Sequence, residues 1–167
     1  MTPTRIIGID PGTHTGIADW DATTQKFIQV LTLPVHRALA YVQDVTLHNA
    51  PCPPVIFEDA RQRTWFGHNV GRERLQGAGA AKRDATIWAD FLEDREIPHI
   101  ARKPSAGSTG WDSGKFRHIT KWDGRTSEHA RDAGVLVYGL TVGEIASVIR
   151  SWSLSRAHPP AHTSARR

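Results

Sequence analysis

Three carboxylates lie at positions where a soluble core normally avoids acid. Asp10 ends the apolar segment RIIGID, Glu58 ends the segment VIFE, and Asp132 precedes the apolar stretch AGVLV. A carboxylate is costly to bury unless it is paired or bound to a metal ion. If the first and fourth predicted strands are neighbours in a sheet, Asp10 and Glu58 converge at one edge of that sheet.

A histidine adds to these carboxylates. His129 precedes Asp132 by three positions, so on a helix both side chains project from one face. We therefore predict Asp10, Glu58, His129 and Asp132 as both the catalytic residues and the metal ligands. Such an oxygen-rich set suits Mg²⁺, and Mn²⁺ as a substitute. Two such ions about 3.5–4 Å apart would stabilise the attacking and leaving oxygens in phosphodiester hydrolysis.

Each of these residues also has a simpler interpretation. Asp10 in Asp-Pro-Gly could start a turn, and His129 could be an ordinary histidine on a helix surface. Ion pairs could account for the other two, with Arg61 or Arg63 beside Glu58 and Arg131 or Arg125 beside Asp132. The metal hypothesis rests on the combination of the four residues in this strand order.

The elements that position these residues follow from hydrophobic periodicity and turn signals. We predict strands at 5–10, 15–20, 27–33, 55–58 and 98–101, and helices at 34–47, 72–96, from a cap at Thr126 or Ser127 to 139, and at 142–152. The first three strands form an antiparallel meander, and the short apolar fourth strand is central. Residues 61–71 and 103–124 are predicted as loops. This order predicts an α/β protein with helices around a mixed sheet.

Composition indicates one globular domain, assigned to residues 1–152, followed by a basic disordered tail at 153–167. Hydrophobic residues make up 39% and charged residues 23% of the 167-residue chain. No apolar run approaches the ~20 residues that span a bilayer, so we expect no membrane partner. Cys52 is the only cysteine, which agrees with a reducing compartment. The expected location is the cytoplasm of a bacterium or of a phage-infected host cell.

Charge is unevenly distributed along the chain. Residues 1–60 hold three basic and six acidic side chains, residues 61–131 hold fourteen basic and nine acidic ones, and residues 150–167 hold four arginines and no acid. A basic surface beside a small acidic cluster suits an enzyme that holds a polyanion and cuts it with bound metal. Solvation of helices and loops by Lys and Arg is the simpler alternative.

A family resemblance enters on three motifs. IIGIDPGT at residues 6–13, followed by Thr15-Gly16, resembles the opening motif of RuvC-type Holliday-junction resolvases, and the spacing between the two parts is that of phage-like members. VIFE resembles the second acidic motif of that family, and HARDA at 129–133 is similar to its final helix motif. The resemblance spans roughly residues 5–140 and covers all four candidate catalytic positions.

The resemblance implies a ribonuclease H-like fold, in which a five-stranded mixed sheet begins with the antiparallel meander and is flanked by helices. It also implies a homodimer that nicks symmetric strands of a four-way DNA junction in a Mg²⁺-dependent reaction, with no other small-molecule cofactor. The segments 65–70 and 103–124 do not align with the DNA-binding residues of the family.

The candidate DNA-binding residues come from the predicted loops and the long helix. An exposed Trp-Phe pair at 65–66 could stack on an unpaired base, and basic side chains could contact phosphates without reading bases. The full set is Arg61, Arg63, Trp65, Phe66, Arg72, Arg74, Lys82, Lys103, Lys115, Arg117 and Lys121.

Three alternative functions stay open at this point. Asp-Pro-Gly-Thr with a following Thr-Gly also resembles the first phosphate loop of actin-like ATPases and sugar kinases, which need two such halves. Another ribonuclease H-like nuclease could cut flaps, single strands or RNA hybrids. A non-catalytic DNA-binding module is the third alternative, and the presence of Asp10, Glu58 and Asp132 argues against it.

Overall fold

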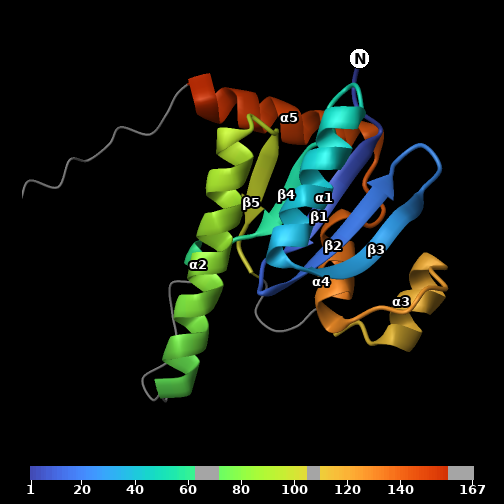
Figure 1. Ribbon diagram of the computed structural model, residues 1–167. Coiled ribbons are helices and arrows are strands. Elements are labelled where there is room, and N and C mark those ends of the chain that lie inside the picture. Colours follow the sequence, from blue (N-terminus) through green and yellow to red (C-terminus); the bar gives the residue numbers. More distant parts are fainter. Residues whose placement is uncertain (63–71, 105–109, 158–167) are drawn as a thin grey trace, which may run out of the picture.

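A computed structural model describes residues 1–62, 72–104 and 110–157 of the chain (Figure 1). The strands are β1 (Arg5–Asp10), β2 (His14–Asp21), β3 (Lys26–Pro34), β4 (Val55–Glu58) and β5 (His99–Arg102). The helical elements are α1 (Val35–His48), the short 3-10 helix η1 (Ala60–Gln62), α2 (Arg72–Asp94), α3 (Ser113–Thr120), α4 (Glu128–Val137) and α5 (Val142–Ala157). All five predicted strands are confirmed.

The five strands form one mixed sheet in the order β3-β2-β1-β4-β5. The first three strands pair antiparallel as the predicted meander, and β4 lies between β1 and β5 and is parallel to both. Strands one and four are therefore neighbours, as the convergence of Asp10 and Glu58 requires. This order and these directions define a ribonuclease H-like fold, so the predicted fold class is confirmed.

Helices cover both faces of the sheet. Figure 1 shows α1 in front of the sheet, α4 behind it, and α2 beside β5. Successive residues of a strand point to opposite faces, and the two hydrophobic clusters follow this rule. Ile7 and Ile9 of β1 belong to the cluster on the α1 and α2 side, whereas Ile6 belongs to the cluster on the α4 side.

Helix α4 begins at the predicted cap. The Ser127 hydroxyl accepts a hydrogen bond from the backbone N–H of Ala130 at 3.1 Å, which satisfies one of the free donors of the first turn. The helix buries Ala130, Ala133, Gly134 and Val137 against the sheet. This spacing of three, four and seven residues makes one apolar face.

The predicted loop at 103–124 contains a helix, so the prediction of an irregular segment is wrong in its second half. Helix α3 starts where the Asp112 carboxylate accepts a hydrogen bond from the backbone N–H of Lys115 at 2.7 Å, and ends at Lys121 in the left-handed conformation. Its one fully buried residue, Phe116, stacks on Phe27 of the meander with ring centroids 5.7 Å apart. Tertiary packing of this ring stabilises a helix that local sequence favours weakly.

The last helix is longer than predicted. Helix α5 continues to Ala157, so it includes residues 153–157 of the predicted disordered tail. The rest of that tail lies outside the described residues. Arg156 contacts Glu93 and Glu96 and lies over the Trp152 ring at 4.9 Å, and these contacts tie the helix end to the end of α2.

The helices were also compared with the dimensions of a bilayer. Within the described residues no single helix is long and apolar enough to cross one. Helices α4 and α5 have the length and apolar composition of a membrane span only when taken together, and the chain bends by 91° between them.

A buried ion pair fastens the far end of β1. The Asp19 side chain is fully buried and accepts hydrogen bonds from the Arg5 guanidinium, at 3.2 Å from Nε, and from the Tyr41 hydroxyl at 3.1 Å. Arg5 also donates to the side chain of Asn49 at 2.8 Å. Burial and the neighbouring Asp19 carboxylate raise the pKa of Tyr41, so its hydroxyl keeps its proton and donates. The network joins β1, β2 and α1.

We expect Asp19→Ala to destabilise the fold by about 3–5 kcal/mol, because it leaves the partly buried Arg5 guanidinium without its partner. The free energy of unfolding in urea measures the effect. Asp44→Ala is the matched control, since the Asp44 side chain is 74% exposed and such a surface change stays within about 0.5 kcal/mol. Equal effects of the two substitutions would contradict the assignment.

Candidate active site

Strands β1 and β4 end at the same edge of the sheet, with Asp10 and Glu58 as their last residues. In the parallel pair of β1 and β4, Ile9 lies opposite Phe57, so the next residue of each strand is a carboxylate. Ile9 and Phe57 point to the α1 side. By alternation, Asp10 and Glu58 point to the α4 side. The predicted convergence of these two acids is therefore present.

Helix α4 brings the other two candidates to the same place. The His129 Nδ1 lies 2.7 Å from Oδ2 of Asp10, across 119 residues of sequence. Asp132 is half-buried one turn further along the helix, and its charge acts on Asp10. His129 therefore contacts Asp10 rather than standing alone on a helix surface.

The environment of Asp10 is both enclosed and acidic. Burial raises the pKa of the Asp10 carboxyl, the hydrogen bond and charge of His129 lower it, and the negative charges of Asp132 and Glu128 raise it again. The net direction is upward. Several carboxylates held together in this way disfavour one another's ionised forms unless a cation lies among them.

The donor set can be compared with the needs of a divalent ion. Carboxylate oxygens with one imidazole suit Mg²⁺ or Mn²⁺ in their chemistry. In the described part of the chain, however, no group of three or more His, Cys, Asp or Glu side chains is close enough to hold an ion. Asp10 and His129 are in contact, the charge of Asp132 acts on Asp10, and Glu58 ends the strand that lies next to that of Asp10. The four residues therefore fit a divalent ion by the chemistry of their side chains and by their positions on β1, β4 and α4.

Two glycines allow α4 to lie this close. A Cβ atom built on Gly16 of β2 would stand 1.9 Å from the carbonyl oxygen of His129, and one on Gly8 of β1 would stand 2.2 Å from that of Ala133. The helix backbone therefore rests on the strands with no side chain between them. This contact sets the height of His129 above the strand that carries Asp10.

Arg61 has a structural partner beside the site. Its guanidinium forms a two-point ion pair with the buried Asp59 carboxylate, at 2.8 and 2.9 Å. Burial raises the pKa of Asp59, but the hydrogen bonds from Arg61 outweigh this effect and the pKa is lowered. The arginine that sequence alone would pair with Glu58 thus contacts the next residue, and its role in holding DNA stays a prediction.

The remaining DNA-binding candidates lie in three regions. Lys103 follows β5, and Lys115, Arg117 and Lys121 belong to α3 or its end, all with exposed side chains. Lys82 is half-buried in α2, and Arg72 and Arg74 lie in the first turns of that helix. Arg63, Trp65 and Phe66 lie outside the described residues. The structure thus separates the basic residues of α3, near the start of α4, from those of α2.

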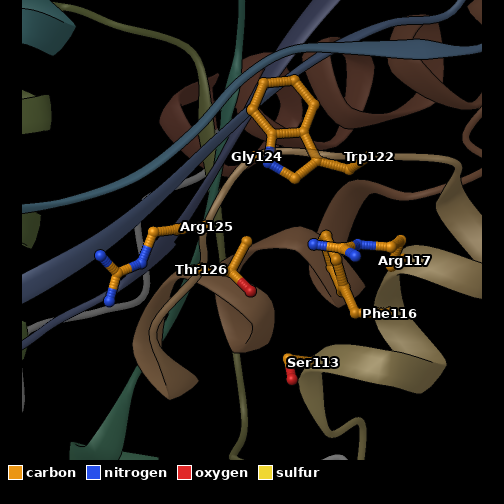
Figure 2. A pocket seen from close by; sticks show the side chains of 7 residues that line it. All are labelled: Ser113, Phe116, Arg117, Trp122, Gly124, Arg125 and Thr126. Carbon is orange, nitrogen blue, oxygen red and sulfur yellow. The ribbon is translucent and has the colours of Figure 1, made fainter.

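One group of residues near the site was missed from sequence. Ser113, Trp122, Arg125 and Thr126 line a pocket together with Phe116 and Arg117 (Figure 2). From the sequence, Arg125 is a possible partner of Asp132, Thr126 is a candidate helix cap, and Ser113 and Trp122 belong to the predicted loop. Local patterns do not signal the pocket, because the fold of α3 against the start of α4 creates it.

The fold of this chain is similar to that of a solved structure, whereas no match was found for its sequence. No protein-family model and no curated protein sequence matches the chain. A structure described as T. thermophilus RuvC in complex with Holliday junction substrate is similar to it with a TM-score of 0.48 and 18% sequence identity, over 91% of this chain and 96% of that one.

We expect Gly16→Ala to displace α4 and to destabilise the fold by about 1–3 kcal/mol or more, because backbone atoms cannot move aside for the added methyl group. Loss of the His129–Asp10 contact should accompany it. Urea unfolding and the imidazole NMR signals of His129 measure the two effects. In the control, Gly143→Ala, the methyl group meets nothing closer than 3.9 Å. An unchanged stability of Gly16→Ala would show that the helix does not rest on this strand.

Proposed function

We propose that this protein is a metal-dependent endodeoxyribonuclease that resolves four-way DNA junctions by paired, symmetric phosphodiester hydrolysis. The observation that carries the proposal is the contact between Asp10 and His129, whose nearest side-chain atoms are 2.7 Å apart. The charge of Asp132 acts on Asp10, and the strand that ends at Glu58 finishes at the same edge of the sheet. The motifs that contain these four residues, which resemble those of RuvC-type resolvases, support the choice of substrate.

Each side chain has a role in this proposal. Asp10, Glu58 and Asp132 would hold the metal ions, and Mg²⁺ bound there would stabilise negative charge and make a water molecule more acidic. His129 is a further ligand or the group that takes the proton of the attacking water. Its side chain is 53% exposed, whereas that of Asp10 is 15% exposed. The carboxylate is thus positioned to orient the imidazole ring, while the ring itself remains accessible to water and substrate.

The charge distribution supports a nucleic-acid substrate. Exposed basic side chains of α3 lie on the chain segment that leads directly into α4, whereas acids gather at Asp10. Phosphates attracted by the first group would bring a phosphodiester to the second.

We also propose that the protein acts as a homodimer and that α2 contributes to the interface. Figure 1 shows the N-terminal part of α2 extending well past the edge of the sheet. Gly77 and Gly79 lie in this helix, and a Cβ atom on either would meet nothing within 4 Å. Small residues on a helix permit close approach of a second helix, and two copies would place two sites on one junction.

A cleavage assay tests the activity directly. Wild type is incubated with labelled four-way junction, flap, single-stranded, duplex and RNA–DNA hybrid substrates, with Mg²⁺, Mn²⁺ or chelator. Asp10→Asn should abolish cleavage and preserve or tighten DNA binding, because it removes a metal ligand and one negative charge that faces phosphate. Asp44→Asn, on exposed α1 surface, is the matched control and should cut like wild type.

The substrate panel separates the alternatives. Paired symmetric nicks confined to the junction, lost with chelator and in Asp10→Asn, support the proposal. If the protein instead cuts flaps, single strands or RNA–DNA hybrids, the assignment of the active site stands and the proposed substrate is wrong. DNA binding without any cutting would favour the non-catalytic module.

The dimer has a separate test. Light scattering of the purified protein should give about twice the chain mass of 18.5 kDa. Gly79→Glu should shift the mass to that of one chain, because a charged side chain would stand where the helices meet; its position faces open space in the single chain, so the fold should be retained. A wild-type mass equal to one chain at assay concentrations, with junction cutting intact, would contradict the dimer.

A further inference from the structure

A small pocket lies between α3 and the segment that enters α4. It is lined by Ser113, Phe116, Arg117, Trp122, Gly124, Arg125 and Thr126, and its volume is about 210 Å³. Figure 2 shows Arg117 reaching in from the α3 side, with Trp122 above and Ser113 below it. Since one water occupies about 30 Å³ in the liquid, the space holds a phosphate group with its waters, and it is smaller than the ~300–1,000 Å³ of typical small-molecule sites.

A second hollow continues the pocket toward the candidate active site. It has a volume of about 330 Å³ and is lined by Leu31, Thr32, Arg125, Thr126, Ser127 and Ala130. Arg125 and Thr126 belong to both hollows, and Figure 2 shows the side chain of Arg125 extending away from the first. Ser127 and Ala130 flank His129 in sequence. The two hollows therefore form a track that runs from α3 to the start of α4.

Polar groups along this track suit an anion. In residues 1–62, 72–104 and 110–157, neither Arg117 nor Arg125 forms an ion pair with a carboxylate. The contact that Arg117 makes is a hydrogen bond of 3.5 Å to the carbonyl oxygen of Asp123. Ser113 and Thr126 add hydroxyl groups to the lining of the first pocket. Arginine and hydroxyl side chains are typical donors to phosphate oxygens.

The walls of the pocket are fixed in place. The Trp122 ring packs on Gly124, whose Cβ position would stand 2.7 Å from the indole nitrogen. That nitrogen is buried and has no hydrogen-bond acceptor among the described residues. From α4, Arg131 donates to the carbonyl oxygens of Trp111 at 2.7 Å and Thr126 at 3.1 Å. The helix that carries His129 thus also holds both sides of the pocket.

We infer that this track binds the phosphodiester backbone of the DNA strand that enters the candidate active site, with Arg117 and Arg125 each contacting a phosphate. The inference rests on the proposed function for the identity of the polyanion and adds the path of the strand. Arg117 and Arg125 are binding residues, and the hydrolysis itself is carried out elsewhere. The small volume and the hydroxyl groups favour the sugar-phosphate backbone over an inserted base.

The test measures affinity without cleavage. Binding of a fluorescent four-way junction is followed by anisotropy in chelator across a series of salt concentrations. The double variant Arg117→Ala/Arg125→Ala should bind roughly tenfold more weakly or worse, and the slope of log affinity against log salt should fall by about two, one for each lost phosphate contact. Arg117→Lys/Arg125→Lys keeps both charges and should recover most of the slope.

A matched control removes the same charge elsewhere. Arg37 belongs to α1 and Arg150 to α5, and both are exposed. Figure 1 shows these two helices apart from α3. Arg37→Ala/Arg150→Ala should leave the salt slope unchanged and alter the affinity less than about twofold. Single-turnover cleavage should also be unchanged in Arg37→Ala/Arg150→Ala, because neither of these arginines is assigned to DNA binding or to the chemical step.

The outcomes separate this inference from the proposed function. Equal loss of affinity in the two double variants, or no loss in either, would overturn the track. If the protein binds junctions through Arg117 and Arg125 but cuts no nucleic acid, the inferred track stands and the proposed nuclease activity is wrong. A wild type that binds no DNA would overturn both.

Discussion

The geometry of the candidate site depends on one backbone contact, that of α4 with the sheet. Gly8 and Gly16 present bare backbone to the helix, and the carbonyl oxygens of Ala133 and His129 occupy the space that side chains would take. At this distance the first turn of the helix meets the end of β1, so His129 reaches Asp10 directly. A helix held a few ångströms higher by ordinary side chains would leave the two residues apart. The same contact sets the position of Arg131, and through it that of the pocket walls.

The candidate site holds a buried carboxylate next to other acidic groups, and a histidine partly offsets the free-energy cost of its negative charge. Asp10 is largely buried beside further carboxylates, which raises its pKa, and His129 offsets part of that cost. The rest of the fold does not need this cluster, since hydrophobic clusters on both faces and the buried pair of Asp19 with Arg5 support the sheet. Acidic groups kept together without structural need are typical of functional sites. The exposed basic side chains of α3 belong to the segment that leads into α4, which agrees with the proposed polyanionic substrate.

Sequence predicted those parts of the protein that depend on local patterns. Alternation and strand order placed Asp10 and Glu58 at one edge, and the spacing of His129 and Asp132 placed both on one helix face. The start of α4 was predicted to within one residue, with Thr126 or Ser127 as the cap, because capping is a local interaction; the structure selects Ser127. Helix α3 was missed because it depends on Phe116 packing against Phe27, distant in sequence. The close approach at Gly16 could not be predicted either, since a glycine alone does not indicate which element lies above it.

The segment between β5 and α4 forms a unit that evolution could exchange separately from the rest of the fold. From residue 110 to the start of α4, this segment is anchored to the rest of the structure by an aromatic stack at Phe116 and by the Arg131 contacts. The acids at the ends of β1 and β4 and the two residues of α4 all lie outside it. Exchange of this segment by recombination, with the anchors kept, would replace the proposed DNA-binding track as one unit. If the proposed function holds, the sheet and α4 would then keep the same candidate active site while the protein acquires a different substrate.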